Sequence, residues 1–107
     1  MHKEAEMIQE REVERALIRA VKRAGGKCLK FVSPGCAGVP DRIYLLPGGR
    51  VFFAEVKQPG GKPRPLQEKR HEELRNLGFE VYVIDGKEEC NGIVEQEKLA
   101  RVPEVCS

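Results

Sequence analysis

The sequence predicts an α/β protein in which helices pack against one mixed β-sheet. Three observations support this fold: an amphipathic helical pattern near the N-terminus, two apolar strand-like runs joined by a Gly-containing turn, and a second helical pattern followed by another strand. The predicted element order is αβββαβ, and one sheet covered by helices is its simplest layered arrangement. With 107 residues, the chain fits one domain over residues 1–107, with a core at about 9–85 and a tail at about 86–107.

The composition indicates a folded protein whose overall charge identifies no partner. The chain has 19 basic and 17 acidic residues, a net charge of +2 and 40% hydrophobic residues. A site for a polyanion would therefore require local clustering of cations. The charged N-terminus lacks the apolar segment of a signal peptide, and no apolar run approaches the ~20 residues that span a membrane. The four cysteines form no Cys-x-x-Cys pair, which favours reduced thiols and a cytoplasmic location.

Residues 3–24 have the period of an amphipathic helix that ends before Gly25 and Gly26. Hydrophobic residues recur in this segment at spacings of three and four: Val13, Ala16, Leu17, Ala20, Val21 and Ala24. At ~100° per residue, Glu10 projects to the same side as this stripe, whereas Glu12 and Glu14 lie at or beyond its edges. Glu10 is therefore the preferred inward carboxylate, unless the first turns extend past the core and leave it in solvent.

A β-hairpin is predicted in the middle of the chain, after a strand over residues 28–32 and a loop rich in glycine and proline over residues 33–40. Its two strands cover residues 41–46 and 50–57, and the turn between them at residues 47–49 contains two glycines. Antiparallel pairing places the beginning of the first hairpin strand beside the end of the second.

Two charged residues lie in the longest apolar run of the sequence, Val51-Phe52-Phe53-Ala54-Glu55-Val56-Lys57. Glu55 and Lys57 are two residues apart, so their side chains project from the same face of the strand. Charges in such a run are costly unless they have a partner or a chemical task. The hairpin also carries Asp41 toward this pair, although it lies fourteen and sixteen residues away in the sequence.

A second helix is predicted over residues 66–77, with Pro65 in its first turn and Gly78 just beyond its end. The inward stripe of this helix is predicted to contain three leucines: Leu66, Leu74 and Leu77. Gln67 leans toward the same side, and Arg70 lies within the stripe as a charged residue that does not fit it.

The last part of the chain is predicted to hold one clear strand, over residues 79–84. Residues 93–101 are then expected to form a short helix within an otherwise loose tail. The two histidines, His2 and His71, are isolated in the sequence and are expected to lie on the surface.

Asp41, Glu55 and Lys57 form a set that is suited to metal-assisted phosphate chemistry. Two carboxylates at one edge of a sheet repel each other, and Mg²⁺ relieves this repulsion because it prefers oxygen ligands and leaves several coordination positions for water and substrate. Such an ion polarises a phosphoryl oxygen and acidifies water. Lys57 would stabilise the developing charge, or position and deprotonate the attacking water.

Three further groups could extend this set. The backbone carbonyl of Val56 could complete the metal shell, Glu10 could supply a third carboxylate, and Gln67 could hold a water or a phosphate. The alternative for Glu55 and Lys57 is a solvent-facing ion pair at the end of a strand, which contributes little to stability. The position of Asp41 after the Gly- and Pro-rich loop favours the metal site over this alternative.

Basic residues follow the second flexible loop and continue into the second predicted helix: Lys62, Arg64, Lys69, Arg70 and His71. They could contact DNA phosphates beside the carboxylates without reading bases. The alternative is a solvated helix face, because acidic residues dilute this charge: Glu68, Glu72 and Glu73.

The sequence resembles the VRR-NUC family, the virus-type replication-repair nucleases of the PD-(D/E)XK superfamily. The resemblance extends over about residues 9–85. It depends on five motifs in order: Gly38-Val39-Pro40-Asp41, Phe53-Ala54-Glu55-Val56-Lys57, Pro59-Gly60-Gly61-Lys62, Pro65-Leu66-Gln67 and Leu74-Arg75-Asn76-Leu77-Gly78-Phe79. The chain is similar to the minimal stand-alone members from phages and bacteria, which implies a bacterial or phage-infected host cytoplasm.

The resemblance implies a restriction-endonuclease-like core and DNA phosphodiester hydrolysis that depends on Mg²⁺, with Mn²⁺ as a substitute. It implies that Asp41 and Glu55 bind the metal and that Lys57 lies at the attacking water. It also implies that Glu10 is the helix carboxylate, with Glu12 and Glu14 as rivals. Gln67 corresponds to the glutamine that follows the lysine motif.

The size of the chain leaves no room for a separate sequence-reading module, so selectivity for DNA structure is expected. A four-way Holliday junction requires two symmetrical nicks, which a twofold homodimer of single-site subunits would supply, and stand-alone relatives are similar to junction-resolving enzymes. The alternatives are a flap or single-strand nuclease, a non-catalytic nucleic-acid-binding module of the same fold, and a small α/β interaction protein that binds no metal.

Overall fold

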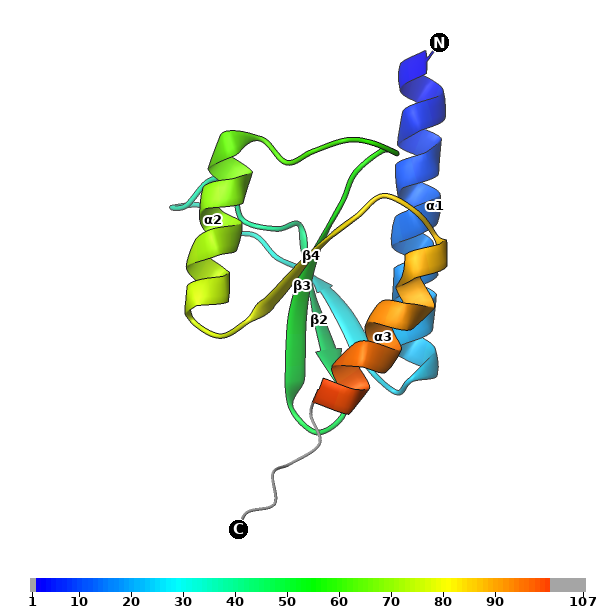
Figure 1. Ribbon diagram of the computed structural model, residues 1–107, viewed down its shortest axis with the longest axis vertical. Coiled ribbons are helices and arrows are strands. Elements are labelled where there is room, and N and C mark those ends of the chain that lie inside the picture. Colours follow the sequence, from blue (N-terminus) through cyan, green and yellow to red (C-terminus); the bar gives the residue numbers. More distant parts are fainter. Residues whose placement is uncertain (1, 101–107) are drawn as a thin grey trace.

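The computed structural model describes the backbone of residues 2–100 and the side chains of residues 9–99. The elements in chain order are α1 (His2–Arg23), β1 (Lys27–Lys30), β2 (Arg42–Leu46), β3 (Arg50–Val56), α2 (Pro65–Asn76), β4 (Glu80–Ile84) and α3 (Glu88–Ala100). These elements form a mixed four-stranded sheet flanked by helices (Figure 1). The predicted α/β class and the αβββαβ order are confirmed, and α3 follows them.

The sheet has the strand order β1-β2-β3-β4, so β3 lies between the hairpin strand β2 and the last strand. The β1–β2 and β2–β3 pairs are antiparallel, whereas β3 and β4 are parallel. In the hairpin, Arg42 faces Ala54 and Leu46 faces Arg50. The central position of β3 explains its apolar sequence, because a strand with neighbours on both sides and helices on both faces is buried.

The two faces of the sheet carry different layers. Helices α1 and α3 cover one face and contact each other, while α2 covers the other (Figure 1). The main core lies on the α1–α3 face and contains Val13, Leu17, Ala20, Val21, Tyr44, Leu46, Phe52, Ala54, Ile84, Cys90, Ile93 and Val94. The α2 face has a smaller aromatic cluster, in which Phe53 contacts Phe31 and Phe79.

Helix α3 differs from the prediction because it begins at Glu88, five residues before the expected start at Ile93. It belongs to the core rather than to a loose tail, since Cys90, Ile93 and Val94 are buried against the rest of the α1–α3 layer. Gly92 in its second turn weakens its local helical signal. Burial against α1 supplies the stabilisation that the local sequence lacks. The tail beyond residue 100 lies outside the described residues.

Helix α2 has nearly the predicted length but presents a different face to the sheet. Leu77 is 74% exposed and Leu66 is 43% exposed, while His71 is only 1% exposed. The predicted surface position of His71 is therefore wrong, and so are the inward positions of Leu66 and Leu77, whereas Leu74 is half-buried and Gln67 leans inward as predicted. Polar partners on β3, rather than apolar residues, determine how this helix is rotated about its axis.

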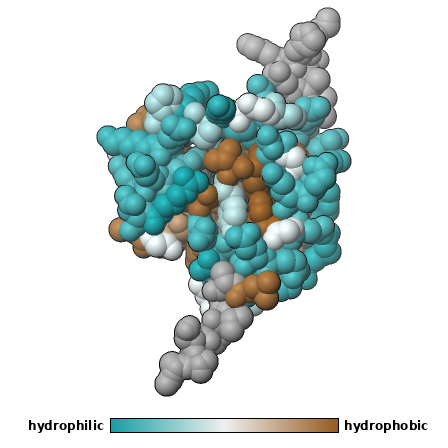
Figure 2. All heavy atoms as spheres, viewed as in Figure 1, coloured by the Kyte–Doolittle hydropathy of each residue, from teal (hydrophilic) through white to brown (hydrophobic). Residues whose placement is uncertain are grey.

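Among the described residues, no helix combines the length and the hydrophobicity that crossing a membrane requires. Figure 2 shows a mostly hydrophilic face, with hydrophobic atoms gathered in a hollow between α2 and the α1–α3 layer. The exposed edge of the sheet at β4 lies in this region of the view (Figures 1 and 2), and its Val83 is 37% exposed.

Candidate active site at the end of strand β3

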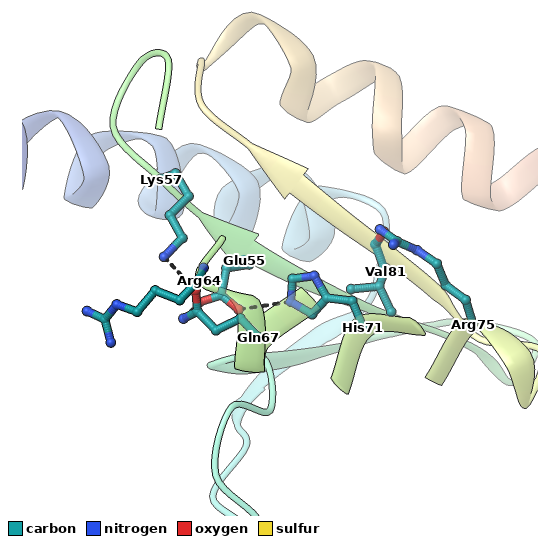
Figure 3. Close-up of polar contacts among 7 residues, drawn as sticks. All are labelled: Glu55, Lys57, Arg64, Gln67, His71, Arg75 and Val81. Carbon is teal, nitrogen blue, oxygen red and sulfur yellow. Dashed lines mark hydrogen bonds and ion pairs between the residues drawn. The ribbon is translucent and has the colours of Figure 1, made fainter. Parts of the chain in front are cut away.

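The centre of the candidate site is Glu55, a carboxylate that is only 2% exposed near the end of β3. Its Oε1 lies 3.1 Å from Nε2 of His71, and its Oε2 accepts a hydrogen bond of 3.0 Å from Nε2 of Gln67 (Figure 3). Burial raises the pKa of Glu55, the neighbouring charge of Asp41 raises this pKa further, and the hydrogen bond with His71 opposes both effects. Both oxygens of the carboxylate are thus held by side chains of α2.

Gln67 connects Glu55 to Lys57. Its Oε1 accepts hydrogen bonds from Nζ of Lys57 at 3.0 Å and from the backbone N–H of Arg64 at 2.9 Å (Figure 3). The second contact is a helix-capping interaction, because Gln67 is at the N3 position and Arg64 at the N-cap. The start of α2 therefore fixes the Gln67 amide, which links Glu55 of β3 to Lys57 just beyond the end of that strand.

Asp41 lies immediately before β2, and the register of the hairpin places it across from Glu55. Because Arg42 faces Ala54 in the antiparallel ladder, the preceding Asp41 comes opposite Glu55. Asp41 is exposed, and its charge contributes to the raised pKa of Glu55. The structure therefore brings together the two carboxylates that the sequence placed on opposite strands of the hairpin.

The carbonyl of Val56 points toward the same side as Asp41. The N–H of Lys57 donates to the carbonyl of Ile84 on β4 at 2.8 Å. In a trans peptide the carbonyl of the preceding residue points the opposite way, so that of Val56 is directed away from β4. The register places Pro40 on that side, and proline has no N–H to donate. This orientation is the one required of a carbonyl that completes a metal shell.

The three candidate carboxylates of α1 are not equivalent. Glu14 accepts a hydrogen bond of 2.7 Å from Nε of Arg42, and Glu12 is 3.8 Å from Nζ of Lys87 in an exposed pair. Glu10 is half-buried, as its inward projection predicted, and within the described residues it has no ion-pair or hydrogen-bond partner. The structure does not bring it into contact with Glu55.

The predicted basic residues divide into two groups. Lys62, Arg64 and Lys69 are exposed beside the start of α2. Arg70 is instead engaged within the protein, because its Nε donates to the carbonyl of Ala37 at 2.8 Å and its Nη1 pairs with Glu73 at 3.0 Å. The side chain that did not fit the apolar stripe therefore links α2 to the loop that precedes Asp41.

His71 is the site residue that sequence reasoning missed. A single histidine among charged residues has no distinctive local pattern. The predictions that it lies on the surface and contacts DNA phosphates with the other basic residues are wrong, because its ring is buried against Glu55. Its spacing of four from Gln67 contained the relevant signal, because residues at i and i+4 lie on the same side of a helix. If Gln67 faces the end of β3, His71 must face β3 as well.

The donor chemistry of the site fits a hard divalent cation. Asp41, Glu55 and the Val56 carbonyl all offer oxygen, the ligand type that Mg²⁺ prefers. Burial raises the pKa of Glu55 and the charge of Asp41 raises it further, and a bound cation would offset both effects. No three side chains among His, Cys, Asp and Glu in the described part of the chain form a pre-assembled metal cluster.

Comparisons with known proteins agree with this fold. The model of the VRR-NUC domain matches residues 2–88. The chain is 45% identical over 82 residues to a protein named "Putative nuclease p44" from Acyrthosiphon pisum secondary endosymbiont phage 1, covering 77% of this chain and 88% of that protein. It is also similar to a solved structure described as a VRR_NUC domain, with a TM-score of 0.76, 31% identity, and coverage of 81% of this chain and 95% of the other. The chain therefore belongs to the VRR-NUC family.

Proposed function

We propose that this protein is a metal-dependent DNA endonuclease that hydrolyses phosphodiester bonds. The observation that supports this best is the arrangement of Asp41 and Glu55 at the end of the hairpin, with Lys57 linked to Glu55 through one glutamine amide. Family membership and the name of the phage relative agree with this activity.

In this proposal Asp41, Glu55 and the Val56 carbonyl would hold Mg²⁺, with Mn²⁺ as a substitute. The bound ion would supply Lewis acidity and neutralise negative charge on the scissile phosphate. Glu10 would add a third carboxylate only if its half-buried side chain turned toward the site. The two buried contacts of Glu55 leave further lone pairs on its oxygens, because an ionised carboxylate can accept about four hydrogen bonds.

Lys57 is proposed to act on the attacking water. Its ammonium, held by Gln67 at 3.0 Å, would orient the water and stabilise the charge that develops on the phosphate. The water oxygen forms a bond to phosphorus, one ester P–O bond breaks, the proton of the water passes to solvent, and the leaving oxygen takes a proton from solvent. One DNA fragment keeps the phosphate and the other ends in a hydroxyl group.

The proposed substrate is a branched DNA, and the proposed active form is a homodimer that resolves four-way junctions. One subunit has one such site, whereas symmetrical resolution of a junction requires two nicks that are related by a twofold axis. Exposed Arg64, whose backbone N–H donates to Gln67, and the nearby Lys62 would contact phosphates beside the carboxylates without reading the sequence, and exposed Lys69 would extend this contact along α2.

The direct test compares cleavage of labelled four-way junction, flap, duplex and single-stranded DNA in Mg²⁺ and in EDTA. We expect paired symmetrical nicks in the junction, loss of activity in EDTA, and at least a 10²-fold loss in Lys57→Ala, the lower end of the usual effect of removing one group that stabilises charge in the transition state. Sedimentation of the free protein would measure its oligomeric state.

Each outcome has a defined meaning. Equal cleavage by wild type and Lys57→Ala would contradict the mechanism. Metal-dependent cleavage of flaps or single strands in preference to junctions would reassign the substrate. DNA binding with no cleavage of any substrate would indicate a non-catalytic module of the same fold.

A further inference from the structure

Helix α2 presents two neighbouring pairs of residues to the two chain segments that carry the carboxylates. Gln67 and His71 face Glu55, whereas Leu66 and Arg70 face the loop that leads to Asp41. Each pair has the spacing i and i+4, and the two pairs are offset by one residue. They therefore form two adjacent rows along one helix.

The first pair engages both oxygens of Glu55. His71 is 1% exposed and meets Oε1, and Gln67 meets Oε2 from one turn earlier (Figure 3). Contacts at both oxygens restrict rotation about the last side-chain bond of Glu55, which is otherwise broad. The direction in which Glu55 offers its remaining lone pairs thus depends on α2.

The second pair holds the loop before Asp41. Nε of Arg70 donates to the carbonyl of Ala37 at 2.8 Å. The next residue, Gly38, has φ of +89°, and a Cβ added there would lie 2.9 Å from both Cγ and the carbonyl oxygen of Leu66. Only glycine permits this conformation and this close approach without strain. Asp41 follows three residues later.

The far end of α2 is attached to the same sheet. Nη2 of Arg75 donates to the carbonyl of Val81 on β4 at 2.6 Å (Figure 3), and β4 is the parallel neighbour of β3. The helix is therefore fixed to the sheet at its C-terminal end, while its N-terminal half contacts both carboxylate-bearing segments.

We propose that α2 sets the relative position of the two metal-binding carboxylates, with His71 as the positioning residue for Glu55 and Arg70 as the positioning residue for Asp41. This inference depends on the proposed metal site, and it assigns functions to two residues that lie outside the ligand set. Neither residue is proposed to touch the metal or the DNA.

The test is calorimetric titration of the purified full-length protein with Mn²⁺ alone, combined with urea unfolding of each variant. His71→Leu fills a similar volume but removes the ring N–H that can donate to Glu55. It is expected to weaken Mn²⁺ binding about 10–100-fold, the usual effect of losing a group that orients a ligand. His71→Gln should recover most of the affinity, because its amide nitrogen can donate at a similar position. Arg70→Met should also weaken binding.

The matched control is Leu74→Ala, which truncates a half-buried residue of the same helix that makes no polar contact with the site. It should lower the urea midpoint and leave the Mn²⁺ affinity unchanged. If His71→Leu and Arg70→Met behave like this control, or if His71→Gln binds no better than His71→Leu, the positioning functions are overturned. Should His71→Leu not fold, weakened binding is still required of Arg70→Met, and wild-type affinity in that variant overturns the inference.

Failure of the proposed function gives a different result. Wild type would then bind no Mn²⁺, or would bind it equally well after Asp41→Asn. An intact wild-type site that is insensitive to changes at His71 and Arg70 would instead overturn only the assignment to α2.

Discussion

Two glutamates are buried to the same extent on opposite faces of the sheet, and their surroundings differ. Glu97 of α3 is 1% exposed and pairs with Nε of Arg50 at 2.5 Å, and it also accepts a hydrogen bond from the hydroxyl of Tyr82. Glu55 of β3 is 2% exposed but meets an imidazole and an amide, with Asp41 as the neighbouring charge.

The difference shows that two equally buried glutamates can have opposite electrostatic surroundings. The charge of Glu97 is neutralised inside the fold by Arg50, which joins α3 to the β2–β3 hairpin. At Glu55 burial raises the pKa and the charge of Asp41 raises it further, while His71 and the charge of Lys57 lower it. Perturbed carboxylates of this kind are typical of functional sites.

The largest expected effect is a difference in DNA cleavage between substitutions at the two glutamates. Glu55→Gln should reduce cleavage of the preferred DNA substrate by about 10³-fold or more, because a metal ion contributes several kcal/mol to stabilising such a transition state. Glu97→Gln should retain activity per folded molecule. Rates measured with each variant at a temperature where it is fully folded would test this, and equal losses would remove the distinction between the two sites.

The second prediction concerns stability, for which we expect Glu97→Gln to be more damaging than Glu55→Gln. Glu97→Gln leaves Arg50 without its counter-charge and should lower the free energy of unfolding by about 2 kcal/mol. This is less than the loss for a fully buried pair, because the Arg50 side chain is 24% exposed. Urea unfolding would measure it, with Lys98→Ala as the control in an exposed pair with Glu95. A change within 0.5 kcal/mol for Glu97→Gln, roughly the range for neutral surface changes, would contradict the prediction.

The third prediction follows from the raised pKa of Glu55. A carboxyl whose pKa is raised by folding contributes its stability at low pH and loses it as the pH rises through the folded value. Without metal, Glu55→Gln should therefore be more stable than wild type at pH 7 to 8, on the order of 1 kcal/mol. The advantage should shrink as the pH falls toward the ordinary glutamate pKa of about 4.3.

Urea unfolding in EDTA across this pH range would measure the difference. Asp41→Asn should give a smaller gain, because it removes only the like charge and leaves Glu55 buried. A wild type that gains stability over Glu55→Gln with rising pH would show that the sign is wrong.

The smallest expected effect concerns the salt dependence of DNA binding, compared between exposed lysines on the two sides of the sheet. Lys62, beside the candidate site, should contact a phosphate, so Lys62→Gln should lower the salt slope of DNA binding by about 0.9, one contact's contribution in duplex DNA. Lys98→Gln on α3 has the same charge change and should leave the slope unaltered. Binding measured in EDTA over a range of salt concentrations tests this, and equal slopes for the two variants would exclude Lys62 from the DNA interface.

Sequence patterns were sufficient where a signal lies within one element or its immediate neighbour. Glu55 and Lys57 were recognisable as charges in an apolar strand, and the glycines of the turn predicted the hairpin that brings Asp41 beside them. The inward projection of Glu10 agrees with its half-buried position, although its function stays a prediction. The register of β2 and β3 then required no information from the rest of the chain.

The errors occurred where a distant contact decides the orientation of an element. The leucines of α2 suggested the wrong face because the energy of its packing comes partly from His71 and Gln67 against a buried carboxylate. The length of α3 was underestimated because Gly92 weakens its local pattern, and because burial of Cys90, Ile93 and Val94 against a helix near the other end of the chain stabilises it.

The sequence by itself determined the α/β class, the order of the strands along the chain, the family resemblance, and the meeting of Asp41 with Glu55 and Lys57. These features depend on periodicity, turn residues and pairing between adjacent strands, which are short-range properties. Only the tertiary structure decided that His71 holds Glu55, that Arg70 holds the loop before Asp41, and that Glu97 is neutralised by Arg50. Each of these contacts joins side chains that no local pattern pairs, and its free energy exists only after the elements that carry them have docked on one another.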